Sequence, residues 1–200
     1  MGARFTPGTS TPLPFTGRDR LLAAIDGAVC LADPALITHA LQKVLREAII
    51  DPLIELPPCV RRPVDGHYAR RELHRSPTLG YSVIAMCWGP GQGTPLHDHD
   101  AMWCVEGIWQ GELIVTPYAL LERQGDRHRF AAQEALYGYR GSAGSLIPPH
   151  EYHTLRNASD TDVAVSVHVY QGVMERSAVF DPLDDGWYQR RVKMMETDAA

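Results

Sequence analysis

The sequence predicts a mainly β protein in which α-helices precede an antiparallel β sandwich or barrel. Apolar side chains recur at helical spacing within residues 18–50, which predicts helices there. Residues 64–195 are divided into short β-branched or aromatic runs separated by Gly, Pro and Asn. Short strands at such even spacing are typical of sandwiches and barrels, which bury one face of each strand.

Chain length and charge narrow the class of protein. The 200 residues are enough for one domain with its own hydrophobic core. The formal net charge is −5 and no basic face is evident, so we expect no nucleic-acid binding. No apolar run reaches the roughly eighteen residues that a membrane-spanning helix needs. We expect a single-domain protein that is a monomer or a small homo-oligomer and binds no membrane.

The N-terminus and the cysteines predict a cytoplasmic location. Residues 1–17 form an arm rich in Pro, Gly and Thr, without the apolar segment of a secretory signal. The cysteines are scattered and show no paired metal-ligand spacing, so we expect reduced thiols at Cys30, Cys59, Cys87 and Cys104.

The helical region contains a clear division into two helices. Asp33 followed by Pro34 is a good N-cap and first-turn pair, and it separates two amphipathic segments. Residues 53–63 are rich in proline, and we expect them to form a connector rather than a third helix.

One predicted strand has two contrasting faces. Residues 163–170 alternate strictly, so Val165, Val167 and Val169 share one face. Ser166 and His168 lie on the opposite face together with Tyr170. Because an all-valine face belongs in a core, the polar face meets solvent or lines a polar cavity inside a small barrel.

Histidines gather in two separated stretches. His97 and His99 flank Asp98, and alternation along a strand would place both rings on one face, as chelation of one ion requires. A pair of solvated polar residues at a strand end would show the same pattern. A second Gly- and Pro-bounded stretch some fifty residues later contains Pro148, His150, His153 and Asn157.

These stretches resemble the paired motifs of the cupin superfamily. Gly91, His97 and His99 match the first motif, and the second stretch matches the other motif, with His150 in place of the usual glycine. Within cupins, the chain resembles the cysteine dioxygenase family of thiol dioxygenases. This resemblance rests on the Trp88–Gly91 stretch, the H-D-H triplet, Cys104 and the Ser166-x-His168-x-Tyr170 strand.

The resemblance implies a cupin-type barrel, also called a double-stranded β-helix or jelly roll, with a non-haem Fe(II) centre. His97, His99 and His153 would be the metal ligands. Three imidazoles leave coordination positions open, which suits an Fe(II) centre that must accept both substrate and O2. The implied activity is a dioxygenase that adds both atoms of O2 to the sulfur of a small thiol acid and yields a sulfinate.

Two other function classes remain open, and the first of them depends on Glu106. Many cupins supply a glutamate as a fourth ligand, and Glu106 lies two residues beyond the position that carries it. With Glu106 as a ligand, the protein would be a different metal-dependent cupin enzyme, such as an isomerase or a C–C dioxygenase. A non-catalytic cupin module that binds a small ligand is the remaining class.

The resemblance also assigns roles around the metal. Cys104 and Tyr170 correspond to residues that form a thioether crosslink in mammalian-type members, so this crosslink is possible here. Tyr170 would hydrogen-bond the substrate carboxylate or bound oxygen. Ser166 and His168 would orient Tyr170 through hydrogen bonds. A solvent-facing polar row is the alternative for Ser166 and His168, and a small buried thiol is the alternative for Cys104.

Substrate choice depends on what holds the carboxylate. The resemblance places Tyr68, Arg70 and Trp88 at the substrate, and a guanidinium can grip a carboxylate through two parallel hydrogen bonds. Only one of Arg70 and Arg71 can face the cavity of a strand, and a shift of one position would exchange them. We expect a small mercapto-carboxylic acid, with cysteine first and 3-mercaptopropionate or mercaptosuccinate as alternatives.

Overall fold

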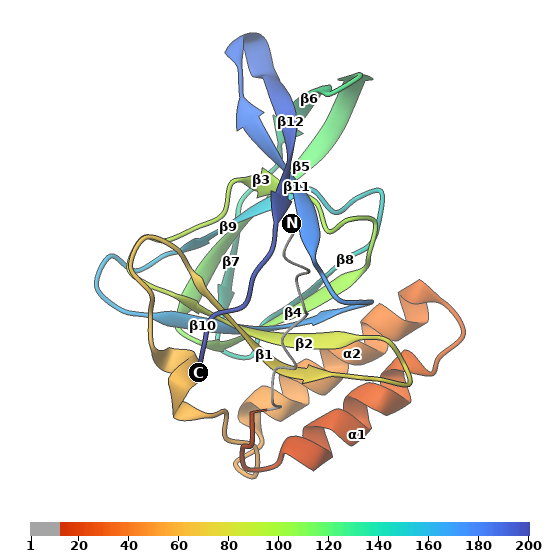
Figure 1. Cartoon of the computed structure of the whole chain (residues 1–200), viewed down its shortest axis with the longest axis vertical. Helices are drawn as coiled ribbons and strands as arrows, with labels where there is room; N and C mark the ends of the chain where they lie inside the picture. The colour runs from red at the N-terminus through yellow and green to blue at the C-terminus, as the bar shows by residue number, and fades with distance from the viewer. Residues whose placement is uncertain (1–12) are drawn as a thin grey trace, which may run out of the picture.

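The structure, a computed structural model, describes residues 13–200, so most of the predicted arm over residues 1–17 lies outside the described residues. Two helices come first, followed by one short 3₁₀ turn: α1 (Arg18–Val29), α2 (Pro34–Ile50) and η1 (Pro58–Arg61). The predicted helices are therefore confirmed (Figure 1). None of the described helices has the length and apolar character to cross a membrane.

The remaining chain forms two antiparallel sheets. The five-stranded sheet has the order β1 (Ala69–Arg75), β2 (Ser82–Trp88), β10 (Ala164–Tyr170), β4 (Cys104–Gln110), β8 (Ala143–Leu146). The seven-stranded sheet has the order β6 (Arg127–Ala132), β12 (Trp187–Met194), β11 (Arg176–Pro182), β3 (Leu96–His97), β9 (His153–Asn157), β5 (Glu112–Gln124), β7 (Leu136–Tyr139). A 3₁₀ turn, η2 (Asp184–Gly186), joins β11 to β12. The mainly β, cupin-type barrel that the sequence predicts is confirmed.

The helices cover the outer face of the five-stranded sheet. Asp33 caps α2 by accepting a hydrogen bond from the backbone N–H of Leu36 at 3.0 Å. The buried face of α2 packs on β4, where Gly107 allows a close approach. A Cβ at Gly107 would lie 3.1 Å from Ile49 Cδ1 and 3.2 Å from Leu45 Cβ. The missing side chain at Gly107 therefore lets helix and sheet pack together.

Both faces of β10 are buried, for different reasons. Val165, Val167 and Val169 pack into the large hydrophobic core beneath the helices. On the other face, Ser166 and His168 are almost fully buried inside the barrel. Of the two alternatives for this polar face, the structure shows the interior one. A barrel built in this way has an apolar outer core and a polar inner wall.

Part of the seven-stranded sheet projects beyond the barrel. In Figure 1 the β5–β6 and β11–β12 hairpins extend upward, away from the helices. A separate aromatic cluster joins them, in which Phe130 and Phe180 have ring centroids 4.9 Å apart. His128 is also buried here and stacks on Phe130. The hairpins therefore hold together through a core of their own.

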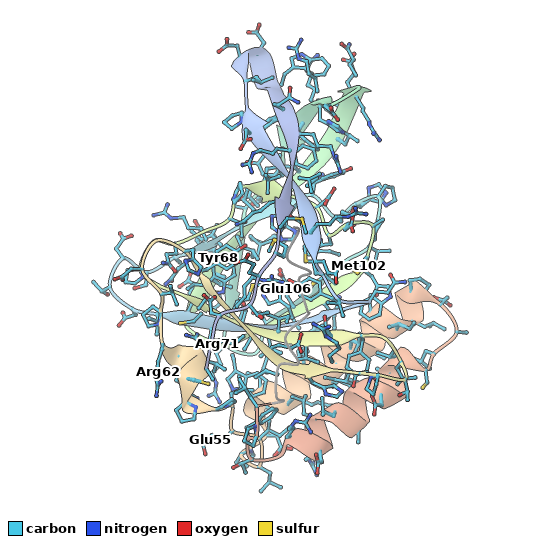
Figure 2. The ribbon with its side chains drawn as sticks, viewed as in Figure 1. Glu55, Arg62, Tyr68, Arg71, Met102 and Glu106 are labelled. Carbon is cyan, nitrogen blue, oxygen red and sulfur yellow. The ribbon has the colours of Figure 1, made fainter. Side chains whose placement is uncertain are left out.

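The C-terminal residues run along β1. The backbone N–H of Asp198 donates to the Arg70 carbonyl, and Asp198 Oδ2 accepts from the Arg70 backbone N–H at 2.8 Å. Asp198 Oδ1 lies 2.9 Å from His67 Nε2, and Arg71 Nε donates to the Ala199 carbonyl at 3.0 Å. Arg71 is labelled beside this segment in Figure 2. These bonds tie the end of the chain to the edge of the five-stranded sheet.

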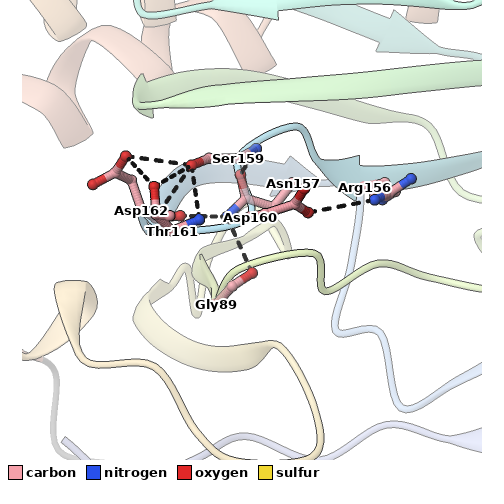
Figure 3. A network of polar contacts seen from close by, with 7 residues as sticks. All are labelled: Gly89, Arg156, Asn157, Ser159, Asp160, Thr161 and Asp162. Atoms are coloured by element: carbon pink, nitrogen blue, oxygen red, sulfur yellow. Dashed lines mark hydrogen bonds and ion pairs between the residues drawn. The ribbon is translucent and has the colours of Figure 1, made fainter.

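A buried asparagine fixes the loop that follows β2. Asn157 Nδ2 donates to the carbonyls of Gly89 at 3.0 Å and Asp162 at 2.8 Å (Figure 3). It also donates to the Trp88 carbonyl at 3.0 Å. Its Oδ1 accepts from the backbone N–H of Ser159 at 3.0 Å. Asn157 is fully buried, so these carbonyls depend on the amide rather than on water.

We expect Asn157→Ala to lower the free energy of unfolding by about 3 kcal/mol, because it removes the buried amide that donates to the carbonyls of Trp88 and Asp162. Urea unfolding of the metal-free protein measures this change. Asp160→Asn is the matched control: its Oδ1 lies 3.7 Å from Arg156 Nη2 in an exposed pair of the same loop. The control should change the unfolding free energy by less than about 0.5 kcal/mol, and equal losses in both variants would contradict the assigned role.

Candidate metal centre

Three histidine rings converge inside the barrel. His97 on β3 lies directly opposite His153 on β9 in the sheet register, and their ring centroids are 4.5 Å apart. The His99 ring lies 5.2 Å from that of His97 and 5.0 Å from that of His153. One ligand nitrogen from each ring lies within 4.8 Å of the others. The structure thus brings together the three residues that the sequence predicts as metal ligands.

His99 reaches this cluster for a reason other than strand alternation, so that part of the sequence argument is wrong. β3 ends at His97, and His99 lies in the loop that follows. Asp100 and Ala101 then take left-handed conformations with φ of 53° and 61°. Asp98 Oδ1 accepts from the backbone N–H of Ala178 at 2.8 Å, which fixes the loop to β11. A turn, rather than the pleat, therefore positions the second ring.

Hydrogen bonds orient two of the rings. His97 Nδ1 lies 3.1 Å from the Pro95 carbonyl, and His153 Nδ1 lies 3.2 Å from the Glu151 carbonyl. Since a carbonyl only accepts, each Nδ1 carries the proton and each Nε2 keeps a free lone pair. His153 Nε2 and His99 Nδ1 are buried with no hydrogen-bond partner among the described residues. Unpartnered buried nitrogens that face one another are what a bound metal ion would satisfy.

Burial keeps these rings uncharged. It lowers the pKa of His97 to about 4 and holds the pKa values of His99 and His153 well below the ordinary value. Neutral imidazole is the form that binds a transition metal, and three such donors suit Fe(II), Zn(II) or a similar ion. The residues present therefore fit the non-haem iron that the sequence predicts.

Ser166 and His168 belong to a buried hydrogen-bonded chain. The indole N–H of Trp88 donates to Ser166 Oγ at 2.9 Å, and Ser166 Oγ lies 2.7 Å from His168 Nε2. Because the hydroxyl proton needs an acceptor, it goes to Nε2, and the His168 proton resides on Nδ1. That nitrogen lies 3.5 Å from Glu106 Oε2 and 3.9 Å from Cys104 Sγ. The hydrogen-bonded chain thus runs from Trp88 through Ser166 and His168 to Cys104, and Glu106 lies beside its end.

Glu106 lies outside the histidine cluster. Its labelled position in Figure 2 is in the body of the barrel, and its nearest ring is that of His168. Burial raises the pKa of Glu106 to about 7 and lowers the pKa of His168 to about 3. Between these values both groups are neutral, so the pair is a polar contact rather than an ion pair. In the described structure, the metal-ligating group consists of three histidines without Glu106.

Cys104 and Tyr170 are neighbours across two strands. The β4–β10 register sets them directly opposite each other, and a hydrogen bond joins their side chains. The Tyr170 ring lies 6.0 Å from His99 and stacks on His168 at 5.9 Å. Within residues 13–200, no hydrogen bond joins His168 to the Tyr170 hydroxyl. His168 therefore contacts Tyr170 through its ring face, which differs from the predicted hydrogen-bonded relay.

A pocket opens beside the histidines. Tyr68 and Trp88 stack with ring centroids 4.6 Å apart and an interplanar angle of 23°, and both line the pocket with Tyr170. The space between atoms there is about 410 Å³, part of it open to solvent. The wall is completed by side chains that include Met86, Thr94, His97, His99, His168, Met174, Ser177, Lys193 and Met195. A small molecule would thus contact both the rings and the metal ligands.

The β1–β2 register distinguishes the two arginines. Arg70 is opposite pocket-lining Met86, whereas Arg71 is opposite Ala85 in the outer core. Arg70 Nη1 donates to the Glu196 carbonyl at 3.0 Å, and its buried Nε has no partner among the described residues. Arg70 therefore faces the barrel interior, where its charge acts on Cys104, His168 and Tyr170.

Sequence reasoning missed several pocket residues, including a charged one and a neighbouring hydroxyl. Lys193 on β12 and Ser177 on β11 line the pocket and are paired in the β11–β12 register. Both lie outside the histidine motifs, and no local pattern marks them. Only the return of the C-terminal hairpin to the barrel brings them to the histidines.

The fold and the site define a class: a cupin-type barrel that carries a three-histidine metal-binding group. A model of the family described as "Cysteine dioxygenase type I" matches residues 65–182, which is more than half of the chain. The chain therefore belongs to the cysteine dioxygenase type I family.

Similar proteins include "Cysteine dioxygenase type 1" from Danio rerio, 28% identical over 106 residues, and from Homo sapiens, 26% identical over 101 residues. Each alignment covers 50% of this chain and 50% of the relative, so the chain spans about half the length of the curated relatives it matches. Among solved structures, the TT1209 protein from Thermus thermophilus is 20% identical with a TM-score of 0.45 over 58% of this chain and 94% of that chain. An oxalate oxidase in complex with glycolate is 22% identical, with a TM-score of 0.41 over 55% and 53% of the two chains. Likenesses of this size do not bear on function.

We expect His153→Ala to abolish tight binding of a divalent transition metal, since only two of the three imidazole ligands remain. Metal content after dialysis against Fe(II) or Co(II) measures the loss. His150→Ala is the matched control, because His150 is exposed and only three residues away. It should retain full metal content, and metal retained by His153→Ala would contradict the assigned centre.

We expect Glu106→Gln to stabilise the protein more at about pH 8 than at about pH 5. The folded-state pKa of about 7 lies above the ordinary 4.5, so the folded protein holds a proton that the unfolded chain has released between these values. Wild-type stability therefore falls as the pH rises through this window, and the neutral amide removes that loss. Urea unfolding should show a gain of up to about 3 kcal/mol between the two conditions. A difference that does not vary with pH would contradict the buried carboxyl.

Proposed function

We propose that the protein is a non-haem Fe(II)-dependent thiol dioxygenase that acts on a small mercapto-carboxylic acid. The observation that carries this proposal is the convergence of three neutral imidazoles, with unpartnered nitrogens, at the wall of a small pocket. Membership of the cysteine dioxygenase type I family supports the same reaction class.

The proposed reaction converts a thiol to a sulfinate. Two S–O bonds form and the O–O bond breaks, so the sulfur loses four electrons and the two oxygen atoms gain them. The thiol proton is released, and no reductant other than the substrate is needed. Ferrous iron, when held by His97, His99 and His153, supplies the redox-active centre at which a thiolate and O2 can react.

Residues of the chain organise the space around that centre. Tyr170 lies between His99 and Cys104, where its hydroxyl can hydrogen-bond the bound substrate. Cys104, which is directly opposite Tyr170, would be its partner in a thioether crosslink, in which a C–S bond forms and O2 takes up the two electrons and two hydrogens that are lost. Trp88, Ser166 and His168 hold the wall behind Tyr170 through their hydrogen bonds.

Arg70 is the proposed anchor for the substrate carboxylate. Its guanidinium is buried, its Nε is unpartnered, and no acidic side chain of the described residues pairs with it. A buried cation without a counter-ion favours an anionic ligand. Tyr68 and Trp88 form the stacked floor against which the carbon chain of the thiol would lie.

No observation favours the two other classes. The isomerase or C–C dioxygenase hypothesis needs Glu106 at the metal, but Glu106 Oε2 lies beside His168. A non-catalytic binding module would not need the buried, unpartnered imidazole nitrogens of His99 and His153. Both classes predict no thiol-dependent O2 consumption.

We expect iron-loaded protein to consume O2 with at least one of cysteine, 3-mercaptopropionate and mercaptosuccinate, measured with an O2 electrode and by sulfinate formation. Arg70→Gln should lower kcat/KM for the preferred thiol acid about 100-fold, because a charged hydrogen-bonded contact is lost. Arg75→Gln on the same strand is the control, since Arg75 pairs with Glu72 away from the pocket. An unchanged substrate ranking in Arg70→Gln would remove Arg70 from this role, and no uptake with any thiol would refute the proposed function.

A further inference from the structure

The pocket wall contains one formally charged side chain among the described residues, Lys193. Lys193 lies on β12 and is half-buried, with its ammonium nitrogen 5.7 Å from the centroid of the Tyr68 ring. Its charge also acts on His97. Lys193 is therefore positioned between the aromatic floor and the histidine cluster.

Nothing in the described structure neutralises this cation. No acidic side chain of residues 13–200 lies within ion-pair distance of Lys193, whereas the exposed Lys43 pairs with Glu47. A lysine that served only solubility would not need to be half-buried against a pocket. A cation–π contact with Tyr68 holds the ammonium there, but it leaves the ammonium protons free to donate.

The described pocket lining also offers no anionic side chain that would pair with an ammonium group of a ligand. It contains no aspartate or glutamate among the described residues. A free amino acid thiol carries an α-ammonium group near pH 7. That group would meet Lys193 without a carboxylate to offset the repulsion. The wall thus disfavours cysteine and favours a second acidic group in its place.

We propose that Lys193 is a second anion-binding residue, and that the preferred substrates are small thiols bearing two carboxylates; this inference rests on the proposed dioxygenase function. Arg70 on β1 and Lys193 on β12 come from the two different sheets of the barrel. The charge of Arg70 acts on Tyr68 and Tyr170 of the pocket, and the Lys193 ammonium lies over the Tyr68 ring, so one carboxylate would bind on the Arg70 side of Tyr68 and the other on the Lys193 side. Ser177, which pairs with Lys193 in the register, adds a hydroxyl on the same wall.

Kinetics with matched thiols test the assignment. The probes are mercaptosuccinate with two carboxylates, 3-mercaptopropionate with one, and cysteine with one carboxylate and an ammonium. We expect mercaptosuccinate to have the highest kcat/KM. Lys193→Met should lower its kcat/KM about 100-fold, whereas 3-mercaptopropionate should change less than about threefold. Lys193→Arg keeps the charge and should recover most of the loss.

A control variant separates this effect from a general loss of charge. Lys43→Met removes an exposed lysine of α2 whose side chain pairs with Glu47 at 3.8 Å. It should leave the kinetics with all three thiols unchanged. An equal loss for 3-mercaptopropionate and mercaptosuccinate in Lys193→Met would overturn the two-carboxylate assignment, because Lys193 would then hold the only carboxylate.

Binding to the metal-free protein provides a readout that does not depend on turnover. Succinate should raise Tm of the wild-type protein more than propionate does, because it can reach both cations. Lys193→Met should lose this difference, and Lys193→Arg should keep it. If the methionine variant does not fold, the arginine variant and the comparison of the two acids in the wild type still test whether Lys193 binds a second carboxylate.

The outcomes distinguish this inference from the proposed function. O2 consumption that is fastest with cysteine, together with equal effects of succinate and propionate on Tm, would overturn the role of Lys193 and leave the dioxygenase function intact. Conversely, a succinate effect that depends on Lys193 without O2 consumption from any thiol would refute the dioxygenase and leave a dicarboxylate site.

Discussion

The pairing of β3 with β9 is the constraint on which the site depends. It sets His97 directly opposite His153, and the loop after β3 adds the His99 ring. The barrel interior holds these rings away from water, so they stay neutral and keep lone pairs free for a metal ion. Burial of polar nitrogens without hydrogen-bond partners usually destabilises a folded protein. Here the same burial leaves the three imidazoles suited to bind a metal ion.

The barrel achieves this through strands that bury both faces. On β10 the valines complete a core beneath the helices, and the opposite face places Ser166, His168 and Tyr170 inside. Hydrogen bonds link the polar residues of the inner wall from the Trp88 indole through Ser166 and His168 to Cys104. Such a chain fixes the orientation of each ring, and it supports the candidate site from behind without contributing a metal ligand.

Charge within the barrel follows a consistent pattern. The buried histidines and Glu106 are held in neutral forms by desolvation, whereas Arg70 and Lys193 keep charges that no described side chain compensates. Uncompensated cations in a low-dielectric interior are unfavourable unless an anion joins them. The two-carboxylate thiol that we propose as substrate would place an acidic group beside each of these cations.

The sequence alone determined the helices, the antiparallel barrel, the histidine motifs and the contrasting faces of β10, because local periodicity and motif spacing encode them directly. The tertiary structure decided what depends on contacts between distant segments: the turn that positions His99, the register that points Arg70 rather than Arg71 inward, and the contact of Glu106 with His168. Lys193 reaches the pocket only because the C-terminal hairpin returns to the barrel. Strand register and chain return are set by the packing of the whole domain, and no local pattern specifies them.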